Sequence, residues 1–188
     1  MEHSTAFSPI SVRKLFTLIE TEYSTRKEIF GIPEKLFFQP EKYESLSMEM
    51  FGQNLDSPIG VAAGPHTQMA QNIISAWLCG ARYIELKTIQ TLDELEISKP
   101  CIDMQDEGYN CEWSQELRIQ ESFDEYLKAW VLIHLLQHKL GLNHQQGRGF
   151  IFNMSIGYNF EGIQKENVQW FLNSMADCTK AKQEMVDA

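Results

Sequence analysis

Three short apolar segments, each followed by a stretch of helical character, dominate the second half of this sequence. The segments span 59–63, 83–86 and 150–156, and the helical stretches follow at about 68–79, 122–139 and 166–185. Short strands that alternate with helices of this length form right-handed βαβ units around a parallel sheet. The pattern therefore predicts an α/β fold whose sheet is covered by helices.

The length of the chain limits how much of such a fold it can complete. A closed eight-stranded α/β barrel takes roughly 250 residues, whereas this chain has 188. We predict a partial TIM (β/α)8 barrel made of the first three βα units. The last predicted helix has no stop signal, so we expect a fragment of a longer protein. Its two open sheet edges could support self-association.

The residues before the barrel form a separate predicted unit. Apolar residues recur at helical spacing over 12–30, until Gly31, Pro33 and Pro40 end the pattern. Residues 46–50 then alternate at period two before a turn at 52–54, which indicates a short β-hairpin. We predict a helical N-terminal extension over 1–42 and an incomplete barrel domain over 43–188.

Charge and cysteine content narrow the functional class. The net charge of −10 argues against binding to nucleic acid or to an anionic membrane, and no stretch is long and apolar enough to span a bilayer. The four cysteines are widely spaced and form no CxxC pair, as expected for reduced thiols. We expect a cytoplasmic protein that acts on a small molecule.

Residues at the carboxyl ends of the predicted strands are the candidate ligand contacts, because α/β sheets bind ligands there. Ala62, Ala63 and Gly64 would let a flat ligand approach the backbone and its amides, although tight strand-to-helix packing also explains them. Lys87 follows Glu85 on the same face of the second strand. A structural ion pair between these two residues competes with a functional role.

Two further segments add polar candidates. The long loop after the second strand carries Asn110, whose amide can donate and accept at once. Asn153 and Ser155 share one face at the end of the third strand. Polar residues at alternate positions of an apolar strand need partners, which are either other core groups or a ligand.

The stretch HLLQHKLGLNH matches the HxxxHxxGxxH spacing of one class of zinc protease through His134, His138 and His144. Leu135 occupies the place of the glutamate that acts as general base in such sites. The neighbouring leucines favour a helix packed on the outside of a sheet and ended by Gly141. We therefore predict no metal site.

Four motifs in order carry a resemblance to a known family. They are SPIGVAAG, ELKT, an asparagine-bearing loop and NMSIGYN, within about 51–163. Together they resemble the flavin-binding barrel shared by dihydroorotate and dihydropyrimidine dehydrogenases, and most closely the amino-terminal region of selenate reductase large subunits, a group related to the glutamate synthase small subunit. The resemblance implies an FMN-dependent oxidoreductase that passes hydride or electrons between the flavin and a small flat substrate.

The resemblance also assigns residue roles. It implies FMN contacts from Ala62, Ala63, Gly64, Lys87, Thr88 and Ser155, and substrate contacts from Asn110 and Asn153. A cation at Lys87 would stabilise the negative charge of the reduced flavin. In the family, the phosphate site and the catalytic acid or base belong to later strands, so we expect the isolated chain to be inactive.

Two points depart from a complete enzyme of this family. Thr67 and Gln68 stand where some family members carry a lysine after the Ala-Ala-Gly motif. FAD, NADPH and iron–sulfur clusters belong to an electron-transfer module of longer relatives, and no cluster spacing occurs in these residues. The alternative interpretation is a structural or interaction domain that has kept the barrel architecture without its cofactor.

Overall fold

A three-stranded parallel sheet forms the centre of the computed structural model, which describes residues 7–92, 102–103, 109–110, 116–142 and 147–187. Its strands are β5 (Gly60–Val61), β6 (Tyr83–Glu85) and β9 (Ile151–Asn153), in the order β5-β6-β9. Gly60 pairs with Tyr83, and Tyr83 pairs with Ile151. Strands that follow one another along the chain are thus parallel neighbours, which confirms the predicted α/β alternation.

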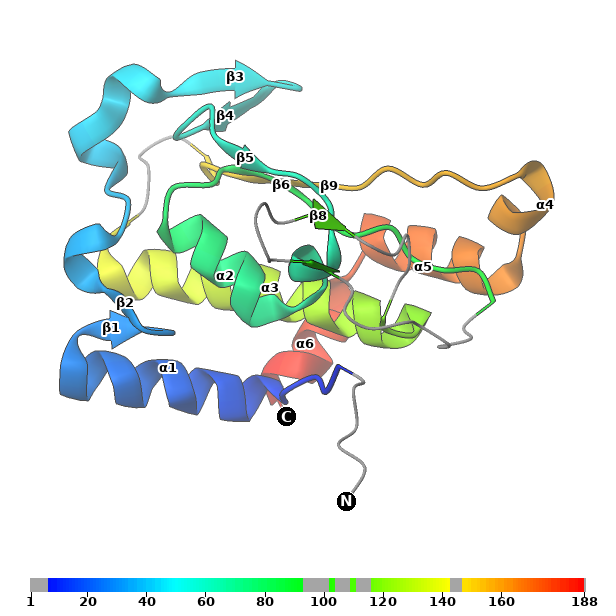
Figure 1. Cartoon of the computed structure of the whole chain (residues 1–188), viewed down its shortest axis with the longest axis horizontal. Coiled ribbons are helices and arrows are strands. Elements are labelled where there is room, and N and C mark those ends of the chain that lie inside the picture. Colours follow the sequence, from blue (N-terminus) through cyan, green and yellow to red (C-terminus); the bar gives the residue numbers. More distant parts are fainter. Residues whose placement is uncertain (1–6, 93–101, 104–108, 111–115, 143–146, 188) are drawn as a thin grey trace.

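Helices cover one face of this sheet (Figure 1). A short helix, η3 (Pro65–Gln68), leads into α2 (Ala70–Leu78), which connects β5 to β6. The long helix α3 (Ile119–Leu140) lies between β6 and β9 in the sequence. Gly141 ends α3 as predicted, with φ +65° and its N–H donating to the Gln137 carbonyl. The antiparallel pair β7 (Ile102–Asp103) and β8 (Tyr109–Asn110) lies in the segment that the sequence indicated as a loop.

The chain after β9 forms three helices, and the last two of them take the place of the single helix predicted over 166–185. The three are α4 (Phe160–Ile163), α5 (Glu166–Ala176) and α6 (Thr179–Asp187). Asp177 is extended, with φ −137°, and its carboxylate accepts a hydrogen bond from the Thr179 N–H at 3.1 Å. This carboxylate caps the start of α6, so the prediction of one continuous helix over 166–185 was wrong.

The N-terminal part contains α1 (Val12–Arg26) and two hairpins. The first hairpin joins β1 (Glu28–Ile29) to β2 (Ile32–Pro33), and the short helices η1 (Glu34–Leu36) and η2 (Pro40–Leu46) lead to the second, β3 (Met48–Met50) with β4 (Gln53–Leu55). The second is the predicted hairpin. Both turn on a Phe-Gly pair with positive φ, Phe30–Gly31 and Phe51–Gly52, as a tight type I′ turn requires.

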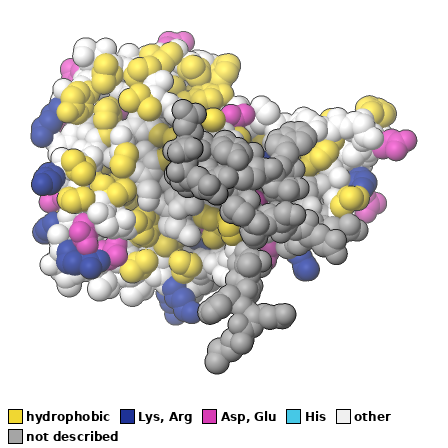
Figure 2. Space-filling view, viewed as in Figure 1, with side chains coloured by type: hydrophobic (Ala, Val, Ile, Leu, Met, Phe, Trp, Pro, Cys, Tyr) yellow, Lys and Arg dark blue, Asp and Glu magenta, His cyan; other side chains and the backbone are white. Residues whose placement is uncertain are grey.

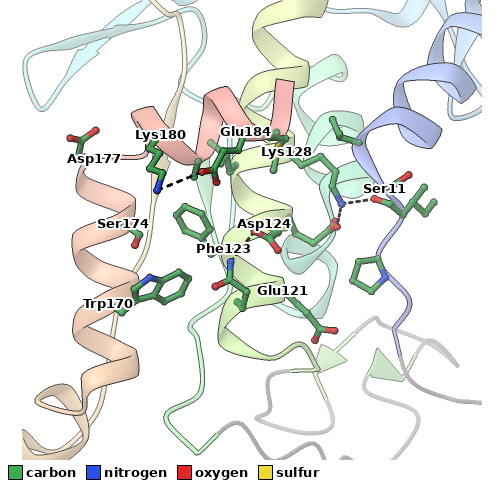
Figure 3. Close-up of a pocket in the computed structure, with 18 residues that line it drawn as sticks. Ser11, Glu121, Phe123, Asp124, Lys128, Trp170, Ser174, Asp177, Lys180 and Glu184 are labelled. Atoms are coloured by element: carbon green, nitrogen blue, oxygen red, sulfur yellow. Dashed lines mark hydrogen bonds and ion pairs between the residues drawn. The ribbon is translucent and has the colours of Figure 1, made fainter. Parts of the chain in front are cut away.

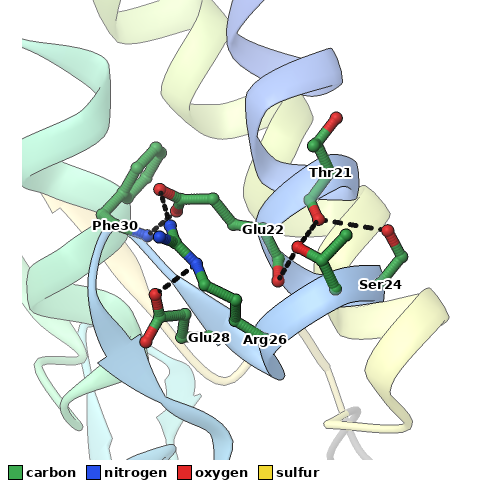
Figure 4. A network of polar contacts seen from close by, with 7 residues as sticks. Thr21, Glu22, Ser24, Arg26, Glu28 and Phe30 are labelled. Carbon is green, nitrogen blue, oxygen red and sulfur yellow. Dashed lines mark hydrogen bonds and ion pairs between the residues drawn. The ribbon is translucent and has the colours of Figure 1, made fainter.

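Polar contacts hold the first hairpin against the end of α1 (Figure 4). The Glu22 carboxylate accepts the Phe30 N–H at 2.6 Å and an Arg26 N–H at 2.9 Å, while Arg26 also contacts Glu28 at 2.7 Å. Lys27 adopts the left-handed conformation that ends the helix. The predicted helix is therefore present but stops four residues before Phe30.

The core lies between the sheet and the helices. Ile84 and Leu86 are buried in it, and Phe152 packs against Trp130 of α3 with ring centroids 5.3 Å apart. Leu15 and Ile19 of α1 belong to the same core cluster. The N-terminal extension therefore packs with the βα units, and the proposed boundary between residues 42 and 43 stays a prediction.

The amino ends of the strands contain a buried ion pair. Arg82 Nε lies 3.2 Å from Asp56 Oδ2, and the two side chains are 1% and 2% exposed. The guanidinium also donates to the carbonyls of Trp77 and Ala81 and lies over the rings of Phe38 and Trp77. Burial lowers the pKa of Arg82, and the Asp56 carboxylate opposes that change. This pair anchors the end of the sheet opposite the candidate site.

No helix within the described ranges has the length and apolar character needed to cross a bilayer. Apolar side chains gather on the surface near the end of the molecule that carries β3 and β4 (Figure 2). The exposed apolar residues of this part of the chain are Tyr43, Leu46, Phe51 and Ile59.

Candidate functional site

The carboxyl ends of the three parallel strands stay together beyond the sheet itself. The Leu86 N–H donates to the Asn153 carbonyl at 2.7 Å, and the Thr88 hydroxyl donates to the Ser155 carbonyl at 2.6 Å. These bonds continue the contact between β6 and the residues that follow β9. The structure thus brings Thr88 next to the strand end that carries Asn153 and Ser155.

Glu85 connects all three strand ends. Its Oε2 accepts the Ala63 N–H at 3.3 Å, and its Oε1 accepts the Ser155 hydroxyl at 3.3 Å. Glu85 pairs with Asn153 in the sheet register, so these residues face the side opposite the buried Ile84. The sequence offered an ion pair with Lys87 as the structural explanation of this carboxylate and did not predict contacts to both neighbouring strands.

The small residues after β5 form a tight turn. Ala62 is exposed, Ala63 is half-buried and Gly64 is buried. The Gly64 N–H donates to the Thr67 hydroxyl at 3.2 Å, and that hydroxyl donates to the Gly64 carbonyl at 3.1 Å. With the Ala63 N–H directed to Glu85, both amides are already satisfied, so a ligand here would meet mainly small side chains and Cα atoms.

His66 limits the space above this turn. A Cβ added at Gly64 would lie 2.7 Å from the imidazole Cε1 of His66, so the ring rests directly against the glycine. The His66 side chain is exposed. A flat ligand that reaches the Ala-Ala-Gly segment would lie beside this ring.

Lys87 is only 5% exposed at the end of β6. Its carbonyl accepts a hydrogen bond from the buried Tyr126 hydroxyl of α3 at 2.6 Å. This bond fixes the backbone that carries the lysine to the helix layer. A buried cation at the carboxyl edge of a parallel sheet is suited to an anionic or electron-rich group of a ligand.

A buried polar network holds the residues that follow the Ala62–Gly64 turn. The Gln68 side-chain amide donates to the Glu116 carboxylate. The Glu116 N–H donates to the Gln68 side-chain carbonyl at 2.9 Å. Glu125 accepts the Ala70 N–H at 2.7 Å and contacts Lys128. The sequence did not predict these contacts because charged residues on an amphipathic helix normally face solvent. The spacing of Glu125 and Lys128 was the available signal.

Asn110 lies in β8, where its backbone pairs with Ile102. Its side chain falls outside the part of the structure that is described. The predicted substrate contact from Asn110 therefore stays a prediction, whereas Asn153 is half-buried beside Glu85 in the sheet register.

The histidines of the HxxxHxxGxxH spacing have surroundings other than a metal site. His134 packs against Trp130 and Phe150, with ring centroids 4.8 and 5.4 Å away. Burial lowers its pKa, and the nearby Arg148 acts in the same direction. His138 is exposed, and His144 lies outside the described residues. Among the described residues, no group of three or more His, Cys, Asp or Glu side chains is arranged to hold a metal ion.

A pocket of about 900 Å3 lies away from the strand ends, between the N-terminal segment and helices α3, α5 and α6 (Figure 3). Its charged groups have partners within the protein, since Lys180 lies 3.7 Å from Glu184 and Lys128 contacts Glu125. Burial raises the pKa of Asp124 at its wall, against the effect of a Gln120 hydrogen bond. We place the candidate site at the strand ends because their backbone geometry favours ligand binding in α/β sheets.

Comparisons with known proteins match this chain to a TIM-barrel domain family. The family model described as "Oxidoreductase YgfK, N-terminal TIM-barrel domain" matches residues 30–186. The Escherichia coli (strain K12) protein YgfK, named as an oxidoreductase, is 50% identical over 171 residues, which cover 91% of this chain and 16% of the relative. The same values hold for its counterpart in Escherichia coli O157:H7.

One solved structure gives a weaker likeness. The crystal structure of a ligand-free type DHODH from Eimeria tenella aligns with a TM-score of 0.45 and 16% identity, over 81% of this chain and 40% of that chain. The chain spans about one sixth of the length of the two Escherichia coli relatives. The family assignment rests on these sequence matches and on the family model.

Proposed function

Because the chain belongs to the family of the N-terminal TIM-barrel domain of the oxidoreductase YgfK, we propose that it forms the flavin-binding part of an FMN-dependent oxidoreductase. The bound flavin would supply hydride or electron transfer to or from a small flat substrate. The observation that carries this proposal is the meeting of Ala63, Thr88 and Ser155 at one sheet edge, beside the buried Lys87.

The surroundings fit a flat ring held by small side chains. Ala62, Ala63 and Gly64 offer a surface with little side-chain bulk, and their satisfied amides leave the contact to be made by packing. Lys87 and Thr88 would face the polar edge of the ring. Ser155 would contact the cofactor, and Asn110 and Asn153 the substrate.

The chain's own residues would position the ring and exclude water from one of its faces. Lys87 would hold positive charge at the site where negative charge accumulates on reduction. The hydrogen bond from Tyr126 to the Lys87 carbonyl keeps that backbone in place. The remaining barrel strands, the catalytic acid or base and the phosphate site would come from a longer protein.

The activity of that longer protein is also a proposal. We expect a reaction of the selenate reductase or dihydropyrimidine dehydrogenase type, with FAD, NADPH and iron–sulfur clusters in an additional electron-transfer module. A cytoplasmic location and self-association through the sheet edges belong to the same set of expectations.

A cofactor-free structural or interaction domain is the second candidate. It is favoured by the hydrogen bonds of the Ala63 and Gly64 amides, whose acceptors are side chains of the protein itself. The two candidates differ in one measurable property, which is the affinity of the protein for FMN.

Purified protein freed of loose flavin is expected to show FMN absorption bands or to take up FMN on titration. A ligand at one hundred times its dissociation constant raises the free energy of unfolding by about 2.7 kcal/mol, so FMN should also raise the melting temperature. Riboflavin, which lacks the phosphate, should bind about as tightly, because the proposed phosphate site belongs to later strands of the barrel. Neither bands nor stabilisation would favour the cofactor-free domain.

Substitution of Lys87 by alanine is expected to lower the midpoint potential of bound flavin, because the variant lacks the cation that stabilises the reduced state. For a two-electron couple, about 30 mV corresponds to each tenfold loss of preference for the reduced form. Lys180→Ala, at a side chain 92% exposed, is the matched control. Equal potentials in both variants would count against the role of Lys87.

A further inference from the structure

The residues that follow β5 extend beyond its pairing with β6. The β5–β6 pairing stops at Val61 and Ile84, yet the predicted cofactor residues Ala62, Ala63 and Gly64 come after it. Only two residue pairs join these strands, so the backbone ladder alone leaves the Ala-Ala-Gly turn weakly fixed. The Glu85 carboxylate supplies the contact that the ladder lacks, through the Ala63 N–H at 3.3 Å.

The same carboxylate reaches the other neighbouring strand. Glu85 belongs to the central strand of the order β5-β6-β9, and each of its two oxygens accepts one hydrogen bond, from Ala63 on one side and from the Ser155 hydroxyl on the other. A neutral aliphatic side chain at this position could make neither contact. One side chain thus spans the three strand ends on which the proposed cofactor contacts lie.

We propose that Glu85 is a positioning residue that sets the distance between the Ala62–Gly64 turn and Ser155, and thereby the width of the flavin surface. The inference rests on the proposed function, which it deepens by assigning a residue outside the predicted contacts. Glu85 and Ser155 are not part of the apolar core, since Glu85 is half-buried and Ser155 is exposed. The carboxylate therefore stabilises a surface edge rather than the packing of the interior.

The charge of Glu85 gives a second, separable property. A carboxylate at the strand ends opposes the accumulation of negative charge on a ligand there, so it acts against Lys87. A purely structural brace would not affect the potential of the flavin. Glutamine keeps the shape and both hydrogen-bonding partners, because its carbonyl accepts the Ala63 N–H and its amino group donates to the Ser155 hydroxyl oxygen.

The test compares Glu85→Ala and Glu85→Gln with an exposed control, Glu161→Ala on α4, in the full chain. Hydrogen exchange of the Ala63 amide, followed by NMR without flavin, should be about tenfold faster in Glu85→Ala and near the parent rate in Glu85→Gln. The FMN dissociation constant should rise roughly tenfold in Glu85→Ala and recover in Glu85→Gln. The midpoint potential should be higher in Glu85→Gln than in the parent.

The results separate the role of Glu85 from the proposed flavin function. Unchanged Ala63 exchange in Glu85→Ala overturns the inference, because the contact would then hold nothing in place. Faster exchange with unchanged FMN affinity also overturns it, since the brace would not act on the flavin surface. If the parent protein binds no FMN, the proposed function fails, and the Ala63 exchange rates still show whether Glu85 fixes the turn.

Discussion

Replacing Arg82 by methionine is expected to lower the free energy of unfolding by about 3–5 kcal/mol, the usual loss when one partner of a buried ion pair is removed. Asp56 is 2% exposed and would lose the guanidinium that lies 3.2 Å from its Oδ2. The same change removes hydrogen bonds to the Trp77 and Ala81 carbonyls. Urea unfolding followed by circular dichroism and tryptophan fluorescence would measure the loss.

Two further variants identify the cause. Arg82→Met combined with Asp56→Leu should be more stable than Arg82→Met alone, because the double change removes the buried carboxylate together with the cation that pairs with it. Lys180→Met breaks an exposed pair with Glu184 and should leave the urea midpoint unchanged. If Arg82→Met were as stable as Lys180→Met, the Arg82–Asp56 pair would contribute nothing to the fold.

The features of the fold that could be predicted from the sequence are those with a local signal. The alternation of apolar strands and helices was sufficient for the parallel sheet of β5, β6 and β9, and Gly141 was sufficient for the end of α3. The break between α5 and α6 depends on one carboxylate, Asp177, which reads equally well as an exposed helix residue. Helical periodicity does not distinguish these two cases.

The candidate site was predicted in part for the same reason. Asn153 and Ser155 were identified as polar residues at the end of an apolar strand, and Thr88 came from the family resemblance; parallel strands bring such positions to one edge. The bonds from Ala63 and Ser155 to Glu85 join residues 22 and 70 positions apart. No local pattern shows which of several acidic residues will make such contacts, since the choice depends on the register of three strands.

The burial of Arg82 is still harder to predict from the sequence. Arginine is seldom fully buried without a partner, so a sequence in which Arg82 precedes a strand suggests a solvent-exposed strand start. Its partner Asp56 lies 26 residues earlier, and the rings of Phe38 and Trp77 come from different elements. Their meeting at the amino ends of the strands becomes visible only once β4, α2 and β6 are packed together.

Gly149 lies against the same ion pair and leads to the second large effect. It has φ +74°, and a Cβ there would lie 2.2 Å from Asp56 Oδ2 and 2.6 Å from its Cγ. Asp56 has little freedom to move, because its N–H donates to the Gly149 carbonyl at 3.0 Å and its carboxylate pairs with Arg82. Gly149→Ala should therefore cost about 2–4 kcal/mol, from backbone strain and overpacking together.

Gly141→Ala separates these two causes. Gly141 has φ +65°, close to that of Gly149, but nothing lies within 4 Å of its added Cβ, so its cost should be about 1 kcal/mol from backbone conformation alone. Thermal and urea unfolding of both variants give the difference that is due to contact with Asp56. Because the two sites are coupled, Gly149→Ala should cost less in an Asp56→Ala background. Equal losses for Gly141→Ala and Gly149→Ala would mean that the Asp56 carboxylate moves aside, and that the ion pair does not hold the amino ends of the sheet rigidly.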